Sequence, residues 1–386
     1  MATDKTIFFV TVTLIVVGIV FSLSLSAFIV QKYEYSDLFF FTRQFTVGML
    51  SIFVIWVISR LNPDKHFNIL GFSIFFIFLA LMTIMHFLPP SYVVEVGGAK
   101  RWIKLPMSSL APVEFFKVGF IFFLAWSFSR KIEPGVVRLR DEFLIFLPYV
   151  MAFGVVVYLI AIMQNDIGQV IVLGTSLAVM AFMAGASTRL FMFSMLGATT
   201  VFIIAIVGSE HRVARVISWW SNTQNFILSF LPESISDRLR VDVSEAPYQI
   251  SNSFYAIKNG GFLGQGLGDG TIKLGYLTEV HTDFVLAGIA EELGLVGIFF
   301  VVSLFFILIF RILKIANRCD NKTHSLFALG VVLLIGTSLF INSYGITGIT
   351  PIKGIAVPFL SYGGSSLLAH SIAIGMVLMI SKKVRY

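Results

Sequence analysis

The chain has 386 residues, of which 57% are hydrophobic and 13% are charged, and its formal net charge is +7. So little charge excludes an ordinary soluble protein of this length, and the many long apolar runs predict transmembrane helices. The basic residues are dispersed between these runs and form no stripe with stacking aromatic rings, which argues against a nucleic-acid partner. The single Cys319 excludes an internal disulfide framework and offers no metal-ligand spacing.

We expect an all-α polytopic membrane protein with about ten transmembrane helices, each able to cross roughly 30 Å of hydrocarbon. The first run is longer than a signal-peptide core and is expected to be retained. No internal repeat is visible, so residues 1–386 are expected to form one membrane domain, with a large extracytoplasmic loop, 209–282, between spans 7 and 8. The predicted spans are 7–30, 40–59, 67–88, 113–129, 143–163, 167–186, 190–208, 284–310, 325–346 and 363–381.

Basic residues predict the orientation of the spans. With both termini in the cytoplasm, the cytoplasmic segments carry 15 of the 28 Lys and Arg residues, as the positive-inside rule requires. These are Lys5, Arg60, Lys65, Arg130, Lys131, Arg138, Arg140, Arg189, Arg311, Lys314, Arg318, Lys322, Lys382, Lys383 and Arg385. The loop 209–282 and Asp283 then lie at the outer face.

The stretch from Tyr276 to Gly294 carries five ionisable side chains directly into an apolar run. A carboxylate near bilayer depth costs roughly 2.5 to 3.5 kcal/mol on insertion scales, so Asp283 predicts a site that faces a cavity. The alternative is that Thr282 or Asp283 caps a helix beginning near Phe284. That alternative leaves His281, Glu291 and Glu292 unexplained.

The predicted outer loop 97–112 places Lys100, Arg101 and Lys104 beside Trp102, on the side where positive charge is disfavoured. An anionic, lipid-linked ligand would explain these cations, since guanidinium and ammonium groups bind phosphates. Trp102 either stacks on a sugar or anchors the loop in the membrane interface.

Three further segments carry polar residues in apolar surroundings. Glu114 and Lys117 meet at i, i+3 on one helix face, either as a structural pair or as a substrate contact. Asp166 is either a helix cap or a ligand inside the helix. Lys353 lies between two prolines, on irregular backbone that a membrane tolerates only in a cavity or buried in protein. The small residues that follow, Ser361, Gly363 and Gly364 among them, allow close helix packing or ligand contact.

Six segments together resemble the SEDS family of bacterial cell-wall polymerases, to which FtsW and RodA belong, over nearly the whole chain. They are GGAKRWIKL (97–105), PVEFFK (112–117), QNDIG (164–168), YQISNSFYAIKNGGFLGQGLG (248–268), YLTEVHTDFVLAGIAEELG (276–294) and PIKGIAVPFLSYGGSS (351–366). The lysine of PIKG favours the division member, FtsW. The chain departs from the family at Thr278, where Pro is usual, and at Gly275, where an acid is frequent in the division subgroup.

The resemblance implies a peptidoglycan glycosyltransferase that polymerises lipid II at the outer face of the bacterial cytoplasmic membrane. The family's essential acid falls on Asp283, which is expected to deprotonate the acceptor sugar hydroxyl. Glu279, four residues earlier, would raise the pKa of Asp283. Arg101, Lys117 and Lys353 are candidates for binding the pyrophosphate, with Trp102, Glu279 and His281 as further substrate contacts. Support roles are expected for Glu114, Asp166, Glu291, Ser361, Gly363 and Gly364.

The resemblance also implies a class B penicillin-binding protein, a transpeptidase, as a partner, together with other division proteins. No metal site and no cofactor is evident in the sequence, and the sequence does not decide whether a divalent cation assists the reaction. Two other classes of function fit ten spans: a lipid II flippase or other transporter with intramembrane carboxylates, and a scaffold that recruits an enzyme. The absence of an inverted repeat and the clustering of motifs towards one face argue against transport.

Overall fold

The computed structural model describes residues 3–96, 99–105, 108–132, 139–208, 210–229, 232–241, 248–351 and 354–384. Within them, nine candidate membrane spans are long and apolar enough to cross a bilayer, which confirms the predicted all-α polytopic class. They are α1 (Lys5–Ser24), α3 (Phe39–Arg60), α4 (Pro63–Ile84), α5 (Pro112–Lys131), α6 (Leu139–Val157) continued by the π-helix η1 (Tyr158–Met163), α7 (Ile167–Ala184), α12 (Val285–Arg318), α13 (Lys322–Ile346) and α14 (Gly364–Ser381).

Two predicted spans differ in detail from the structure. The expected seventh span corresponds to α8 (Thr188–Val207), which is not among the nine candidate spans, although its 20 residues reach about 30 Å as a helix. The expected first span, 7–30, is divided into α1 and a short helix α2 (Ala27–Lys32). Serines surround the break, and the Ser26 hydroxyl donates to the Ser22 carbonyl at 2.6 Å. Such local side-chain bonds compete with the regular helix and explain the interruption.

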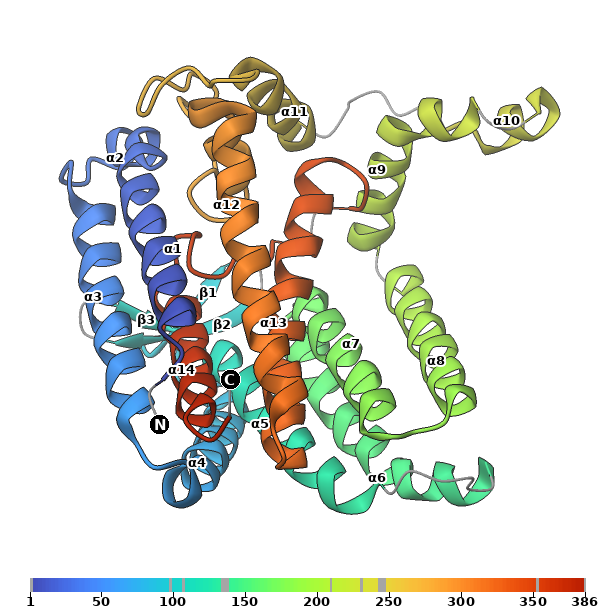
Figure 1. Cartoon of the computed structure of the whole chain (residues 1–386). Coiled ribbons are helices and arrows are strands. Elements are labelled where there is room, and N and C mark those ends of the chain that lie inside the picture. The colour runs from blue at the N-terminus through green and yellow to red at the C-terminus, as the bar shows by residue number, and fades with distance from the viewer. Residues whose placement is uncertain are drawn as a thin grey trace.

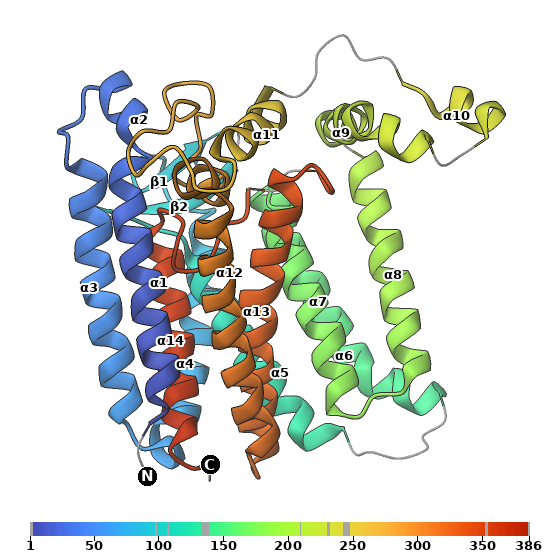
Figure 2. The same cartoon turned by 45° about the horizontal axis from the view of Figure 1, so that its top comes forward.

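Helix α5 lies inside the bundle, where α4, α7, α13 and α14 pack around it. The surrounding arrangement can be followed in Figures 1 and 2. Almost every α5 side chain up to Phe128 is buried, including Phe116 and Phe122. A run that is apolar all round predicts such a fully enclosed helix. Its first turn therefore brings Glu114 and Lys117 into the interior.

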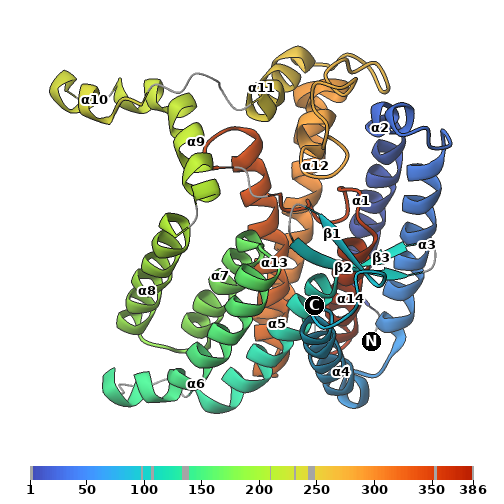
Figure 3. The ribbon, with the colours of Figure 1, turned by 180° about the vertical axis from the view of Figure 1, so that it is seen from behind.

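A three-stranded antiparallel sheet, which the sequence did not predict, occupies the outer loop. Its strands are β1 (Val93–Val96), β2 (Ala99–Leu105) and β3 (Ser108–Leu110), in that order. The sheet contacts α5 and α14 (Figure 3), and it lies towards the end of the bundle away from the chain termini (Figure 2). The register shifts between Val94, which pairs with Trp102, and Glu95, which pairs with Lys100. Arg101 is thus the extra residue of a β-bulge, a feature that redirects side chains.

The predicted large loop contains three helices among its described residues: α9 (Glu210–Leu228), α10 (Glu233–Leu239) and α11 (Tyr248–Gly260). α11 packs on α12, whereas α9 and α10 extend sideways above α8 (Figure 2). The Trp219 indole anchors α9 by donating to the Gly348 carbonyl at 2.7 Å. Both chain termini lie at the other end of the bundle (Figure 2).

Helix α12 is broken at Gly294, where φ is 64° and ψ is −163°. The glycine-rich loop before it supplies the missing backbone partners. Gln265 and Gly266 donate to the carbonyls of Glu291 and Glu292 at 3.0 and 2.9 Å, and the amides of Leu295 and Val296 donate back to residues 261 and 262 at 3.0 and 3.2 Å. A broken helix at membrane depth needs such partners, because unpaired backbone groups are costly there.

Candidate active site

Asp283 lies in the turn that precedes α12. Its amide donates to the Glu279 carbonyl at 3.1 Å, so residues 279–283 form one helix-like turn. The first helical residue is Val285, the N-cap is Phe284, and no side chain caps this helix. The capping alternative for Thr282 or Asp283 is therefore wrong, and the Asp283 carboxylate needs another explanation.

The surroundings of Asp283 favour the protonated carboxyl more than water does. Burial raises its pKa to about 6, with further contributions from the charges of Glu279 and Asp166, while Arg101 opposes the shift. No side chain or amide of the described residues donates a hydrogen bond to the carboxylate. A Cβ atom on Gly354 would lie 2.9 Å from its Oδ2 atom, so any larger residue there would press on the carboxylate.

The Arg101 guanidinium is held by backbone carbonyls at the start of α7. Its Nε donates to Gln164 O at 2.9 Å and its Nη2 to Asn165 O at 2.7 Å. Its Nη1 lies 3.8 Å from Asp166 Oδ2. The side chain remains 32% exposed, which leaves part of the fork accessible to an anion.

Asp166 is the N-cap of α7 and accepts from the Gln169 amide at 3.4 Å. The sequence left Asp166 as either a helix cap or a ligand inside the helix, and this geometry supports the helix cap. Burial raises the pKa of Asp166, and Arg101 opposes that rise. Because Asp166 also acts on the pKa of Asp283, the structure brings Asp283, Glu279, Asp166 and Arg101 into one electrostatic cluster.

Glu114 and Lys117 form an internal pair with Gln169. The Lys117 ammonium lies 3.0 Å from Glu114 Oε2 and donates to Gln169 Oε1 at 2.7 Å. Gln169 in turn donates to Glu114 Oε1 at 3.0 Å. The Lys117 side chain is only 3% exposed and has protein partners, which favours the structural pair over direct substrate contact. Sequence reasoning missed Gln169, although its position one turn after Asp166 was a usable signal.

The segment before α14 donates two hydrogen bonds to the backbone beside Asp283. The Ser361 hydroxyl donates to Thr282 O at 2.6 Å, and the Tyr362 amide donates to His281 O at 2.9 Å. Gly363 and Gly364 then begin α14. The His281 ring packs edge-on against Phe40, with the ring centroids 5.2 Å apart. Burial lowers the pKa of His281 to about 4, so this ring is neutral at pH 7.

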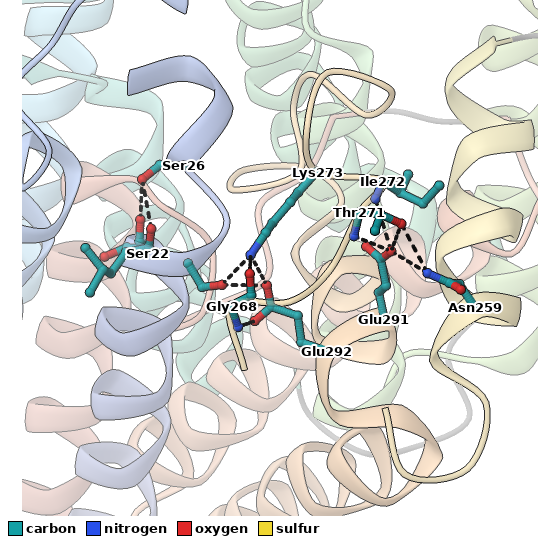
Figure 4. A network of polar contacts seen from close by, with 11 residues as sticks. Ser22, Ser26, Asn259, Gly268, Thr271, Ile272, Lys273, Glu291 and Glu292 are labelled. Atoms are coloured by element: carbon teal, nitrogen blue, oxygen red, sulfur yellow. Dashed lines mark hydrogen bonds and ion pairs between the residues drawn. The ribbon is translucent and has the colours of Figure 1, made fainter. Parts of the chain in front are cut away.

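Figure 4 shows a second polar cluster, built around Glu291 and Glu292. Glu291 Oε1 accepts from Asn259 and from the amides of Thr271 and Ile272, at 2.8, 2.9 and 3.0 Å. Glu292 Oε1 lies 2.6 Å from the Lys273 ammonium, and the Gly268 amide donates to Oε2 at 3.1 Å. These bonds attach the glycine-rich loop to the broken helix.

Trp102 and Lys353 were also expected in the site. Trp102 is half-buried in β2, paired with Val94. Lys353 falls outside the described residues. Across the described ranges, no group of three His, Cys, Asp or Glu side chains is placed to hold a metal ion.

The fold and this cluster define a polytopic membrane protein that keeps an ionisable site at one end of a helical bundle. Residues 4–386 match the family described as "Cell cycle protein", which takes its name from FtsW, RodA and SpoVE, and the chain belongs to this family. The resemblance predicted from the six motifs is thereby confirmed.

A Helicobacter pylori (strain J99) protein named "Probable peptidoglycan glycosyltransferase FtsW" is 47% identical over 384 residues, which cover 99% of each chain. Among solved structures, "Structural coordination of polymerization and crosslinking by a peptidoglycan synthase complex" matches with a TM-score of 0.72 and 22% identity, covering 99% of this chain and 98% of that one. Thermus thermophilus RodA matches with a TM-score of 0.65 and 21% identity, covering 100% and 99%. These two structural likenesses concern the fold.

Proposed function

We propose that this chain is a peptidoglycan glycosyltransferase that polymerises lipid II, and that it acts in cell division. The name of the Helicobacter pylori relative supports the activity and the division role. The observation that carries the site assignment is the Asp283 carboxylate, which has a raised pKa and accepts no hydrogen bond from the described residues. A carboxylate kept without donors is free to accept a proton from a bound hydroxyl.

In the proposed reaction, the 4-hydroxyl of one lipid II sugar attacks the anomeric carbon of a second chain. A C–O bond forms there with inversion, the bond to the polyprenyl pyrophosphate breaks, and Asp283 takes the hydroxyl proton. A pKa of about 6 leaves Asp283 mostly ionised at neutral pH, yet makes it more basic than an ordinary aspartate. Because pyrophosphate is a good leaving group, one carboxylate is enough.

Arg101 is the described cation best placed to bind the pyrophosphate. It is partly exposed, fixed by two carbonyls, and close enough to Asp283 to act on its pKa. Preorganised charge of this kind stabilises the negative charge that develops on a leaving group. We include Lys353 in the same role on the basis of its sequence context, and Trp102 and His281 as contacts to the sugar.

The proposed membrane orientation places both termini in the cytoplasm and the cluster at the outer face of the bacterial cytoplasmic membrane. The distribution of Lys and Arg supports this orientation. The cluster is carried by β2 and by the residues just before α7 and α12, which lie towards the end of the bundle opposite to the termini, as the proposal requires (Figure 2). We further propose a class B penicillin-binding protein as partner, within a larger set of division proteins. The match to a peptidoglycan synthase complex supports such a partner.

The test is polymerisation of purified lipid II by the solubilised protein with its transpeptidase, with glycan lengths resolved on a gel. Wild type should give ladders, and Asp283→Asn should give none while it retains lipid II binding, because the amide keeps the shape but cannot take the proton. Asp64→Asn is the matched control, since Asp64 pairs with Lys383 at the other end of the bundle. Equal ladders from Asp283→Asn would remove Asp283 from the chemistry. Absent ladders from wild type that binds lipid II would favour transport.

A further inference from the structure

Asn342 lies in the last turn of α13 and is only 5% exposed. Its side-chain amide Nδ2 donates to the backbone carbonyl of Asp283 at 2.6 Å and to that of Ile355 at 2.8 Å. One buried side chain thus connects the turn that carries the candidate base to the segment that follows Lys353. Sequence reasoning gave no role to this residue.

The geometry determines which way the Asn342 amide faces. Both of its neighbours are carbonyl oxygens, which only accept hydrogen bonds, so the group between them must be the NH₂. The Oδ1 atom is then buried without a hydrogen-bond partner among the described residues. Leaving a buried acceptor unpaired costs roughly 1 to 3 kcal/mol, so a buried asparagine here calls for an explanation beyond packing.

The two segments that Asn342 joins also contact each other directly. Gly354 has a φ of 58°, and a Cβ atom on it would come within 2.9 Å of Asp283 Oδ2. Its backbone therefore lies against the Asp283 carboxylate, while the Asn342 amide holds the main chains of both segments. A shift of either segment would change the position of the carboxylate relative to the 354–355 backbone.

We propose that Asn342 is a positioning residue for glycosyl transfer, which fixes the Asp283 carboxylate at a constant distance from the segment that begins at Gly354. This inference depends on the proposed role of Asp283 as the base. Asn342 does not touch the reacting atoms. It acts by holding two backbone carbonyls. This keeps Asp283, which activates the acceptor, at a fixed position relative to the donor that binds beside residue 354.

The experiment compares Asn342→Asp, Asn342→Ser and Ser253→Ala in the lipid II polymerisation assay with the partner transpeptidase. Asn342→Asp keeps the shape but turns an oxygen towards two carbonyls, whereas Asn342→Ser keeps one donor and disturbs packing less. Ser253→Ala is the matched control, because this fully buried hydroxyl donates to Ile346 O at 2.9 Å, at the end of the same helix.

We expect kcat to fall at least about tenfold in Asn342→Asp and less in Asn342→Ser, with KM for lipid II within about twofold, because misplacement of a catalytic group by about 1 Å is severe. The acidic limb of the pH–rate profile should also move to lower pH in Asn342→Ser, since a released Asp283 is better hydrated. Glu279, Asp166 and Arg101, the charged groups that act on Asp283, are unchanged in these variants. Ser253→Ala should match wild type in kcat and in the position of the limb.

Two outcomes would overturn the proposal: an Asn342→Ser protein with wild-type kcat and an unmoved acidic limb, or a loss of rate that Ser253→Ala shares. If Asn342→Asp is not recovered folded, Asn342→Ser decides alone. Asp283→Asn is assayed in parallel to separate the two proposals. Activity in Asp283→Asn defeats the base assignment, whereas an inactive Asp283→Asn beside fully active Asn342 variants defeats only the positioning role.

Discussion

Three of the carboxylates in the stretch 276–294, those of Asp283, Glu291 and Glu292, differ in how their oxygens are used. Glu291 and Glu292 accept hydrogen bonds from amides, an asparagine and a lysine, and each is almost fully buried. Asp283, nine residues before Glu292 along the chain, accepts none from the described residues and has a raised pKa. The carboxylates of Glu291 and Glu292 hold the glycine-rich loop to α12, whereas that of Asp283 remains available to accept a proton.

This difference shows why charge in an apolar run is insufficient to identify a catalytic residue. A buried carboxylate with all its acceptor sites occupied is stabilised as a structural ion and would have to break bonds to react. A buried carboxylate that accepts no hydrogen bonds is destabilised in its ionised form and is a better base. The three predictions below test this division, from the largest expected effect to the smallest.

Lys273→Met should destabilise the protein strongly. The Lys273 and Glu292 side chains are 3% and 0% exposed, and breaking a buried pair typically costs roughly 3 to 5 kcal/mol because one charge is left uncompensated. Thermal unfolding in detergent should show a large fall in the midpoint. The double variant Lys273→Met/Glu292→Gln removes both charges and should recover part of the loss.

The control for this prediction is Lys383→Met, which removes one partner of the exposed pair with Asp64. Exposed pairs contribute about 0 to 1 kcal/mol, so its unfolding midpoint should stay near that of wild type. A Lys273→Met protein as stable as Lys383→Met would contradict the structural role of the Glu292 cluster.

Gly354→Ala should reduce the rate while leaving the protein folded. The left-handed backbone disfavours alanine by about 1 to 2 kcal/mol, and the new methyl group would press on the Asp283 carboxylate. We expect kcat to fall about 100-fold through misplacement of the base. Gly268→Ala is the control, because this glycine has a φ of 92° but open space around it. Equal rates for the two variants would mean that contact with Asp283 is unimportant.

Glu279→Gln should move the acidic limb of the pH–rate profile to lower pH by less than about one unit. The charge of Glu279 is the second cause of the raised pKa of Asp283, after burial, so its removal makes the proton easier to lose. In wild type, activity should fall as the pH drops through about 6, where the base becomes protonated. The pH dependence of the initial rate at saturating lipid II measures both values. An unmoved limb would show that Glu279 does not act on the base.

The sequence predicted the spans well because their signal is local: each is a run of apolar residues bounded by charge or glycine. It also placed the Glu114–Lys117 pair correctly, since i, i+3 spacing on a helix forces the contact. The three-stranded sheet was missed because its strands are short, and the bulge at Arg101 hides their alternation.

The contacts that the sequence could not reveal are those between distant segments. Asn342 reaches Asp283 across 59 positions, and Lys273 meets Ser24 across 249. Neither pairing leaves a periodic trace in one sequence. The choice between cap and free carboxylate at Asp283 likewise depended on where α12 begins, and helix boundaries are the least certain part of a sequence-based prediction.

The break at Gly294 divides α12 into a short buried segment next to Asp283 and a longer segment, residues 295–318. Residues 295–318 alone extend about 36 Å as a helix, which exceeds the thickness of the hydrocarbon layer. Residues 285–292, which lead from Asp283 to the break, are all buried in protein. A span longer than the local hydrocarbon layer is accommodated by tilting, kinking or local thickening of the bilayer, which here involves residues 295–318. The depth of Asp283 is set by protein packing, so lipid chain length should have little influence on the geometry of the site.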